Sequence, residues 1–539
     1  MDRRKFIISS SLASVAVTSL SFAGCRSAEA EKDNSSHQEP IAAFELDEIT
    51  IETLQAAMNS GEYTSEKIVK LYLDRINSID KSGPALNSVI ELNPDAIYIA
   101  QGLDKERKAG KIRGPLHGIP VLLKDNIDTG DKMMTTAGSL AMVGNHPEKD
   151  AFVVEQLRKA GAVILGKTNL SEWANFRSSK STSGWSSRGG LTKNPYALDR
   201  NACGSSSGSG VAVSANLCTV AVGTETDGSV VCPASFNGIV GMKPTIGLVS
   251  RAGIIPISHT QDTAGPMART VRDLAILLSC MAGVDQADPV TQNSVTKPKA
   301  DYLKATENPT LKGKRIGIDK AFLQGEDLGC DLFRKVVDQI KAKGGECIEV
   351  DILSKMNELY TREFELMKFE FKADLNAYLA KSTAKVKSMQ DVIDFNKANA
   401  DKVMPFFKQD ILEASQKKAD LNSTEYLELL RKNNEESRVL IDRTLSENRL
   451  DAISGVTIGP AGTTDLILGD HYLGDASTAP AAIAGYPHIS VPMGEVYGLP
   501  VGISFYSSAF EEARLINLAA AFEKEIFQRH KPKFKSTLF

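Results

Sequence analysis

The sequence lacks the residue patterns that hold metal ions. Its seven cysteines include no Cys-x-x-Cys pair, and its seven histidines include no His-Glu-x-x-His segment. Zinc sites depend on such closely spaced ligands, so nothing here supports a metal ion or another cofactor. We therefore expect chemistry carried by the polypeptide alone, with most of the thiols buried as apolar spectators.

An excess of charge of one sign is also missing. The chain has 63 Lys and Arg against 67 Asp and Glu, a net charge of -4, and no long run of either sign. Proteins that bind nucleic acid carry basic patches, so we expect no nucleic-acid partner. Internal repeats and long Pro/Gly/Ser linkers are absent as well, which favours one large domain.

The first thirty residues differ from the rest. Arg3, Arg4 and Lys5 form a basic head, and an apolar stretch diluted with serines follows to residue 24. This stretch is too polar for a convincing membrane span and is typical of an export signal. The basic head resembles a twin-arginine signal, and residues 22–25, which end in Cys25, resemble a lipoprotein cleavage box.

Processing of this segment has three alternatives. Lipidation of Cys25 would anchor the protein to a membrane, Ala28-Glu29-Ala30 offers an ordinary signal-peptidase site, and an uncleaved anchor is the third. We predict an exported protein, periplasmic or anchored as a lipoprotein. The predicted organisation is a signal at 1–30, a flexible polar tether at 31–42 and one folded domain at 43–539.

Strand and helix patterns alternate along the folded part, which predicts an α/β fold. Amphipathic spacing indicates helices between residues 46 and 76, with a helix start at Thr64, and further helices at 152–160 and 333–343. The segment from about 353 to 448 lacks strand signals and predicts a helical insertion that shapes the substrate entrance. Short apolar runs bounded by Gly and Pro predict buried strands of a parallel or mixed sheet at 119–123, 162–165, 218–222, 315–318, 453–458, 489–491 and 501–505.

Two segments carry candidate hydroxyl groups. The first, residues 203–210, packs four serines among three glycines, and by itself such a run is more often a flexible loop. The second places Ser229 after a glycine at the end of a predicted strand, where backbone N–H groups of the turn can stabilise an oxyanion. A helix N-cap is the alternative role for Ser229.

A serine nucleophile needs a base, because its hydroxyl is weak at neutral pH. His117 and His488 stand in Gly/Pro contexts without an evident acidic partner. Lys124 ends the apolar run 119–123, where burial lowers the pKa of an amine into the range of a useful base. The alternative is a strand-end lysine that reaches solvent.

These segments together resemble the ordered motifs of the amidase-signature family. The 24 positions from Ser205 to Ser229 equal the separation in that family, and the resemblance spans roughly residues 46 to 525. It implies a large twisted mixed β-sheet sandwiched by α-helices. The matching motifs are residues 114–125, 166–172, 203–210, 223–233, 238–245, 262–269, 485–492 and 498–502.

The resemblance implies a Ser-Ser-Lys triad for hydrolysis of carboxamide C–N bonds. Neutral Lys124 takes a proton from Ser205, which in the family follows a cis peptide bond and relays that proton from Ser229 during attack on the amide carbon. An acyl-enzyme forms, which water then hydrolyses. Ser206 supports the site by hydrogen bonding. The implied oxyanion hole consists of the backbone N–H groups of Thr226, Asp227, Gly228 and Ser229.

Details of the motifs resemble the peptide amidase branch, whose members deamidate the C-terminal carboxamide of peptides. Many other family members have Ile-Gly-Gly-Ser where this chain has Thr226-Asp227-Gly228-Ser229, and Asp where it has Glu225. The segment Ser183-Gly184-Trp185-Ser186 also fits this branch. We expect Trp185 to line the substrate cleft, with a place in the core as the alternative.

Three other functions stay open. A broad aliphatic, aryl or fatty-acyl amidase shares the motifs, and so does the glutaminyl-tRNA amidotransferase subunit, against which the export signal and the acidic net charge argue. A catalytically silent, lipid-anchored binding protein is the remote alternative, because a fold alone does not certify chemistry. The expected ligand is a small-molecule or peptide amide. The oligomeric state is not indicated.

Overall fold

The computed structural model describes residues 43–295 and 300–538. The predicted export signal, Cys25 and the predicted tether lie outside the described residues, so those predictions stay predictions. The described residues form one compact unit. Within the described part of the chain, no helix combines the length and the apolar character that a membrane span needs.

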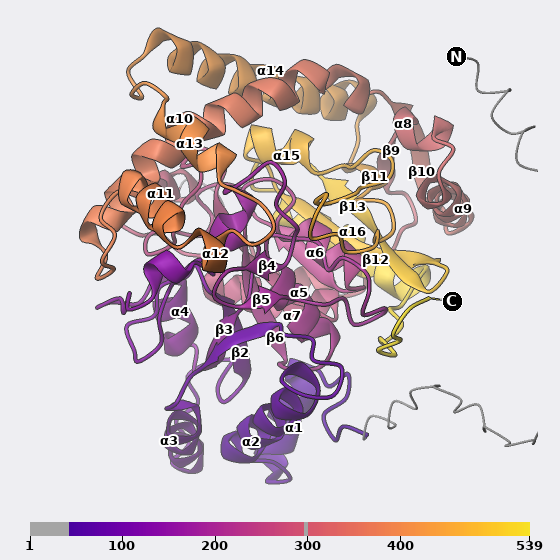
Figure 1. Cartoon of the computed structure of the whole chain (residues 1–539). Helices are drawn as coiled ribbons and strands as arrows, with labels where there is room; N and C mark the ends of the chain where they lie inside the picture. Colours follow the sequence, from indigo (N-terminus) through magenta and orange to yellow (C-terminus); the bar gives the residue numbers. More distant parts are fainter. Residues whose placement is uncertain (1–42, 296–299, 539) are drawn as a thin grey trace, which may run out of the picture. The chain divides into compact units, whose positions relative to one another are not determined.

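An 11-stranded mixed sheet forms the centre of this unit (Figure 1). Its strand order is β1-β3-β2-β6-β8-β7-β12-β13-β11-β9-β10, with parallel pairs around β2 and β9 and antiparallel pairs between them. All seven predicted runs are strands of this sheet. The strands are β1 (Val89–Leu92), β2 (Pro120–Lys124), β3 (Val163–Thr168), β6 (Val220–Glu225), β7 (Val240–Lys243), β8 (Thr263–Ala268), β9 (Arg315–Asp319), β10 (Glu346–Val350), β11 (Ala452–Val456), β12 (His488–Val496) and β13 (Leu499–Tyr506).

Helices pack against the sheet in two groups. The pair α5 and α6 contacts its central strands, and so does the pair α7 and α16. A separate two-stranded sheet joins β4 (Trp185–Ser186) to β5 (Gly190–Leu191). The helices outside the insertion are α1 (Ile51–Ser60), α2 (Ser65–Arg75), α3 (Ala96–Lys108), α4 (Phe152–Lys159), α5 (Ser207–Ser214), α6 (Val231–Phe236), α7 (Val271–Met281), α8 (Lys320–Gln324), α9 (Leu328–Ala342), α15 (Ala479–Ala484) and α16 (Glu512–Glu525).

Predicted local features of the helices agree with the structure. Thr64 caps α2, because its side chain accepts a hydrogen bond from the N–H of Lys67. The Gly/Ser-rich segment is not a flexible loop, since its second half forms the buried helix α5. Its glycines suit close packing: a Cβ on Gly208 would lie 2.3 Å from the carbonyl oxygen of Ser88.

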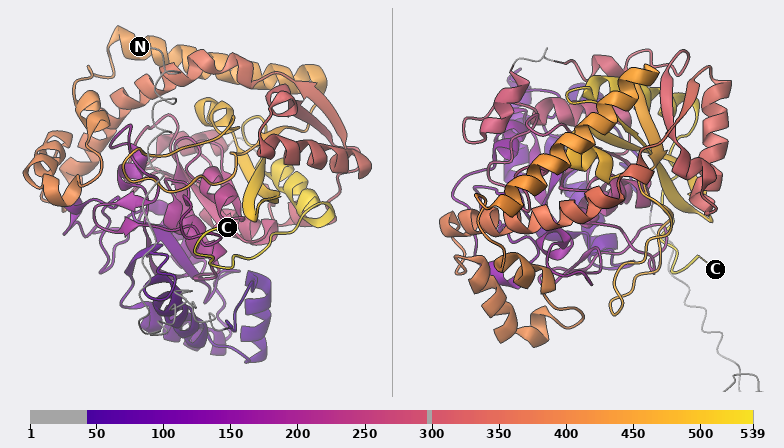
Figure 2. Two further views of the ribbon diagram at one scale, coloured as in Figure 1. Left: turned by 45° about the vertical axis from the view of Figure 1, so that its right-hand side comes forward. Right: turned by 90° about the horizontal axis from the view of Figure 1, so that it is seen from above.

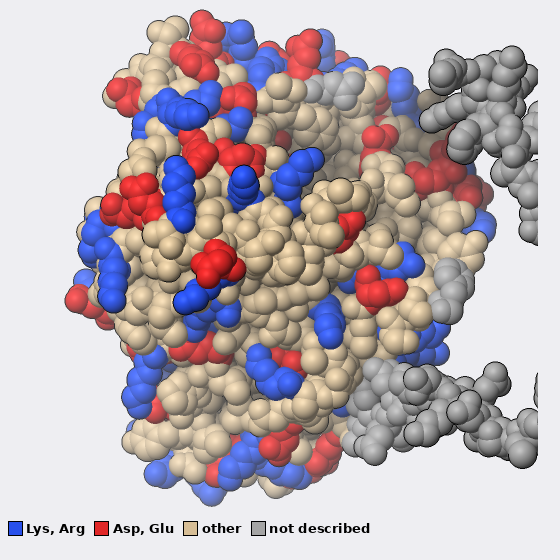
Figure 3. Space-filling model, viewed as in Figure 1, with Lys and Arg blue, Asp and Glu red and all other residues tan. Residues whose placement is uncertain are grey.

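The helical insertion is present. Its two long helices, α10 and α14, lie side by side in both views of Figure 2, and the shorter helices sit between them in the chain. The members are α10 (Asn357–Lys381), α11 (Met389–Ala398), α12 (Ala400–Val403), α13 (Asp410–Gln416) and α14 (Thr424–Asn448). On the face drawn in Figure 3, acidic and basic side chains are interspersed around a central area that carries few of either.

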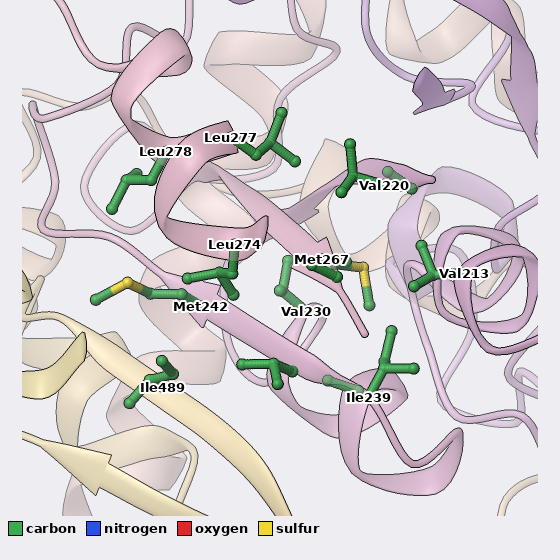
Figure 4. Packing of buried hydrophobic residues seen from close by; sticks show 14 of the residues in the cluster. Val213, Val220, Val230, Ile239, Met242, Met267, Leu274, Leu277, Leu278 and Ile489 are labelled. Atoms are coloured by element: carbon green, nitrogen blue, oxygen red, sulfur yellow. The ribbon is translucent and has the colours of Figure 1, made fainter. Parts of the chain in front are cut away.

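The core beneath the central strands is closely packed (Figure 4). Leu274, Leu277 and Leu278 of α7 are fully buried in the same cluster as Met242 of β7 and Met267 of β8. Val230 is buried in this cluster too. Its methyl groups approach the glycine backbones of β7 and β8 so closely that a Cβ on Gly241 or Gly265 would lie 3.2 or 3.1 Å away. This packing fixes the residue that directly follows Ser229.

Arg177 fastens the insertion to the rest of the unit. It is fully buried, and its guanidinium lies 3.1 Å from the carboxylate of Glu172. It donates hydrogen bonds to the carbonyl oxygens of Phe407 and Lys408, at 2.7 and 3.1 Å, in the segment between α12 and α13. The guanidinium also stacks on the rings of Phe407 and Trp185.

Replacing this anchor should cost much of the stability of the fold. Arg177→Ala leaves the buried Glu172 carboxylate without its ion-pair partner, so we expect the free energy of unfolding to fall by about 3–5 kcal/mol. Urea denaturation followed by circular dichroism measures the change. Arg443→Ala is the matched control, because the pair Arg443–Glu447 on α14 is largely exposed and its loss should leave the midpoint nearly unchanged. Equal urea midpoints for Arg177→Ala and Arg443→Ala would contradict the role of Arg177 as an anchor of the insertion.

Candidate active site

Lys124 is buried at the end of β2, so the alternative of a solvent-reaching lysine is wrong. Its side chain is fully buried, and Nζ lies 2.8 Å from Ser205 Oγ. The other two contacts of Nζ are with Thr224, at 3.0 Å to the carbonyl oxygen and 2.9 Å to Oγ1. Strand β2 lies between β3 and β6, which places the amine inside the sheet.

Ser205 follows the cis peptide bond that the family resemblance implies, between Gly204 and Ser205. The serine is buried just before α5, and its carbonyl oxygen accepts a hydrogen bond from the N–H of Ser171 at 3.1 Å. Gly204 admits no side chain, because a Cβ there would lie 2.3 Å from Ser171 Oγ. The chain around Ser205 is therefore packed closely against Ser171.

Ser229 ends the turn between β6 and α6, and it is not a helix cap. The residue at the N-cap of α6 is Val230, without a side-chain cap. The first N–H groups of the helix, those of Val230 and Val231, donate instead to the carboxylate of Glu225, at 2.6 and 3.0 Å. Gly228 has φ +74°, a left-handed conformation that glycine adopts without strain. The turn thus leaves the Ser229 hydroxyl free of a capping role.

Ser206 joins the two serine segments, as the resemblance implies. Its N–H donates to the carbonyl oxygen of Ser229 at 3.0 Å. Its hydroxyl donates to the carbonyl oxygen of Thr224 at 3.0 Å and accepts from the Thr224 N–H at 3.2 Å. These bonds position Ser205 and Ser229 relative to each other and to the strand that contacts Lys124.

Ser229 lines a cleft of about 350 Å³, together with Thr226, Asp227 and Gly228. In the part of the chain that the structure describes, its hydroxyl makes no hydrogen bond, including to Ser205. Catalytic hydrogen bonds are often long without substrate and tighten when it binds. The apolar part of the cleft wall comes from distant segments: Phe176, Ile257, Phe364, Met367, Ile458 and Ala476.

Burial makes Lys124 a usable base. Desolvation lowers its pKa to about 7, partly offset by the carboxylates of Asp262 and Glu225. Asp262 is itself buried, which raises its pKa to about 6, and it accepts hydrogen bonds from the Thr226 hydroxyl and from the N–H groups of Ile257 and Ser258. The nearest carboxylates therefore stabilise the turn and act on Lys124 through space.

His117 and His488, the two histidines considered as bases, form their hydrogen bonds away from Ser205 and Ser229. His488 is buried beside Ser504 Oγ at 2.6 Å, and burial lowers its pKa to about 3. His117 is buried too, with Nε2 3.0 Å from the carbonyl oxygen of Leu103. Within the described residues, no group of three His, Cys, Asp or Glu side chains is arranged to hold a metal ion.

Trp185 is not brought to this cleft. It is 6% exposed and packs edge to face against Phe406 and Phe407, with ring centroids 5.7 and 5.0 Å apart. It is not among the described residues that line the cleft. Its surroundings match the core alternative, and contact with substrate stays a prediction.

Some residues of the site were not anticipated from the sequence. Thr224 and Asp262 lie in the matched motifs, but no pattern assigned them contacts with Lys124 or the turn. Asp470 is a second case, because its carboxylate accepts hydrogen bonds from Ser183 and Asn201 and so fixes the loop that carries Tyr472 to the cleft. Nothing in the local sequence around Asp470 reveals this long-range role.

Comparisons with known proteins show which family the chain and its fold resemble. The chain matches the family described as Amidase over residues 67–516. A peptide amidase from Stenotrophomonas maltophilia has the same fold, with 45% identity, a TM-score of 0.87 and coverage of 91% of this chain and 100% of that chain. The structure of a peptide amidase with the competitive inhibitor chymostatin gives 45% identity, a TM-score of 0.87 and coverage of 90% and 99%.

A curated relative agrees too. A probable amidase of Arabidopsis thaliana is 42% identical over 506 residues, which are 92% of this chain and 93% of that protein. The family match covers most of the chain, and the fold is shared with solved amidases. The chain belongs to the amidase-signature family and is an amidase of that family.

Proposed function

We propose that this amidase hydrolyses carboxamides with Ser229 as nucleophile, Ser205 as proton relay and Lys124 as base. The observation that carries the proposal is the buried amine of Lys124, 2.8 Å from Ser205 Oγ. A neutral amine has two N–H donors, which match the two Thr224 oxygens. Its lone pair is then left for the Ser205 hydroxyl proton.

The reaction follows from this arrangement. Ser229 attacks the amide carbon while its proton passes through Ser205 to Lys124. Return of that proton to the leaving nitrogen releases ammonia or an amine and leaves an acyl-enzyme. Backbone N–H groups of Thr226, Asp227, Gly228 and Ser229 stabilise the oxyanion. Water then attacks the acyl carbon, and its proton passes through Ser205 to Lys124. Return of this proton to Ser229 Oγ releases the carboxylic acid and restores the enzyme.

For the substrate, we propose the C-terminal carboxamide of peptides. The similarity to peptide amidases, at 45% identity over nine-tenths of the chain, supports this choice. The apolar wall formed by Phe176, Phe364 and Met367 suits the side chains of a peptide. An aryl or fatty-acyl group would also fit such a wall, so a broad-specificity amidase is the alternative.

Ammonia release tests both the mechanism and the substrate. We expect kcat/KM for peptide amides to exceed that for simple aliphatic amides and anilides. Ser229→Ala should lower the rate by roughly a million-fold, because the covalent step is lost. Lys124→Ala should lower it by about a hundred- to ten-thousand-fold, because the base is lost. Retained turnover in either variant argues against the triad, and equal rates on all amides favour the broad alternative.

The pH profile tests the identity of the base. Lys124 acts only when neutral, so kcat/KM should fall as the pH drops below its pKa of about 7. The Asp262 carboxylate raises the pKa of Lys124, so Asp262→Asn should move this acidic limb to lower pH. Asp338→Asn, a change at an exposed carboxylate of α9, is the control. A limb that stays in place in Asp262→Asn would assign the titration to another group.

We further propose that the enzyme acts outside the cytoplasm. The basic head at Arg3 and Arg4 and the box before Cys25 support export. Expressed with its own N-terminus, the protein should appear in the membrane fraction with a lipid on Cys25, detected by mass spectrometry. Cys25→Ala should release it from the membrane. A product cleaved after Ala30 would favour the ordinary signal-peptidase route, and an unprocessed cytoplasmic protein would contradict export.

A further inference from the structure

Asp227 carries a side chain that the proposed chemistry does not use. Its backbone N–H belongs to the proposed oxyanion hole, and many family members have glycine here, where this chain has Asp. The reaction therefore needs the backbone at this position and no side chain. The carboxyl group of Asp227, two residues before the proposed nucleophile, is therefore available for a role other than bond cleavage.

The Asp227 carboxyl group is the charged feature of the cleft. Among the described residues that line the cleft, no other has a carboxyl, ammonium, guanidinium or imidazole group. Its Oδ1 is buried and has no hydrogen-bond partner within the described chain. An unpaired polar atom in a buried place costs free energy, and this oxygen is available to accept a hydrogen bond from a group that enters the cleft.

The neighbours of Asp227 define what it accepts. Burial raises its pKa to about 7; the Thr478 hydroxyl and the Lys243 ammonium lower it, and Glu225 raises it further. On α10, the carboxyl group of Glu363 receives a hydrogen bond from Gln261 at 2.7 Å, and the charge of Asp227 contributes to its raised pKa. Glu363 and Lys243 are both buried and do not line the cleft, so the Asp227 carboxyl group is the acidic group that a ligand in the cleft meets. An N–H donor is favoured there and a carboxylate is repelled.

We propose that Asp227 forms a binding subsite for the nitrogen on the α-carbon of the acyl group, as a peptide N–H or an α-ammonium. The inference rests on the proposed function and deepens it. When the substrate carbonyl oxygen lies against the N–H groups of residues 226–229, the atoms next to the carbonyl carbon lie beside the side chain of the same turn. An α-amino acyl group supplies an N–H donor there, and a plain fatty or aryl acyl group supplies none.

The negative charge of Asp227 also acts on the product of the reaction. The product of deamidation is a carboxylate, formed next to an acidic side chain that the amide did not oppose. Repulsion between Asp227 and the new carboxylate weakens product binding relative to substrate. The subsite therefore favours uptake of the amide and release of the acid.

Three amides that share a phenyl ring test the subsite. Acetylphenylalaninamide has a peptide N–H on the α-carbon, phenylalaninamide has an ammonium there, and 3-phenylpropanamide has neither. For wild type and Asp227→Asn, ammonia release gives kcat/KM for each. We expect the preference for the two α-amino amides over 3-phenylpropanamide to fall about ten- to a hundred-fold in the variant, the size expected for one hydrogen bond to a charged group. The larger loss for phenylalaninamide would identify the ammonium as the better ligand, and a larger loss for acetylphenylalaninamide the peptide N–H.

Several results would overturn the inference. Because Asn keeps an acceptor oxygen, the inference is overturned when the preference is unchanged in both Asp227→Asn and Asp227→Gly, which means that the side chain does not touch the α-nitrogen. An equal loss on all three amides means that it acts on the reacting amide itself. Asp374→Asn, which removes a carboxyl group from the adjoining cavity beside His259, is the control; the same change of preference there would indicate a general charge effect. If Asp227→Asn does not fold, judged by circular dichroism and by fluorophosphonate labelling of Ser229, Asp227→Gly provides the family residue for the same measurement. If wild type hydrolyses none of the amides, the proposed function fails first.

Discussion

The burial of an amine without a carboxylate in direct contact is the constraint on which the site depends. Taking an ammonium out of water is costly, so the group becomes neutral at a lower pH instead. Lys124 meets this condition because β2 lies between β3 and β6, inside the sheet. The contacts of its Nζ are with Ser205 and Thr224, which supply hydroxyl and carbonyl oxygens but no full charge. The nearest carboxylates, Asp262 and Glu225, stabilise the ammonium from a distance and keep its pKa near 7.

The rest of the site follows from what must surround that amine. Ser205 has to stay next to Lys124, and close packing at Gly204 and the bond from Ser171 hold it there. Ser229 has to stay next to Ser205, and the three bonds of Ser206 span the two segments. Glu225 takes over the first N–H groups of α6, so the hydroxyl of Ser229 is not consumed as a cap. Each bond therefore restricts the separation of the three groups that are proposed to act in catalysis.

Local sequence patterns predict the apolar strands of this fold but few of the long-range contacts of the site. Long apolar strands were predicted correctly, because hydrophobic runs are local, whereas β7 and β8 were missed, and so were the edge strands β1 and β10. The first two are interrupted by Gly, and β8 also by Pro, and they become strands only through their neighbours. The resemblance to the amidase-signature family is confirmed. The contacts of Asp470 and Trp185, and the bond between Asp262 and Thr226, could not be read from local patterns, since the partners lie far away in the chain.

The groups proposed for catalysis and much of the cleft wall come from different parts of the chain. The groups proposed for bond cleavage lie on β2 and around β6, α5 and α6, near the centre of the sheet. Part of the cleft wall, including Phe364 and Met367, comes from α10 of the insertion, more than a hundred residues later.

The insertion is tied to the sheet domain by Arg177, whose guanidinium contacts Glu172 on one side and the segment before α13 on the other. Because the catalytic segments do not depend on α10 for their mutual hydrogen bonds, the insertion can change its lining residues without disturbing the amine and the two serines. In the proposed site Asp227 is the exception, since its backbone N–H serves the reaction and its side chain serves the ligand. Selectivity at that position is therefore limited to side chains that leave the backbone of the turn in place.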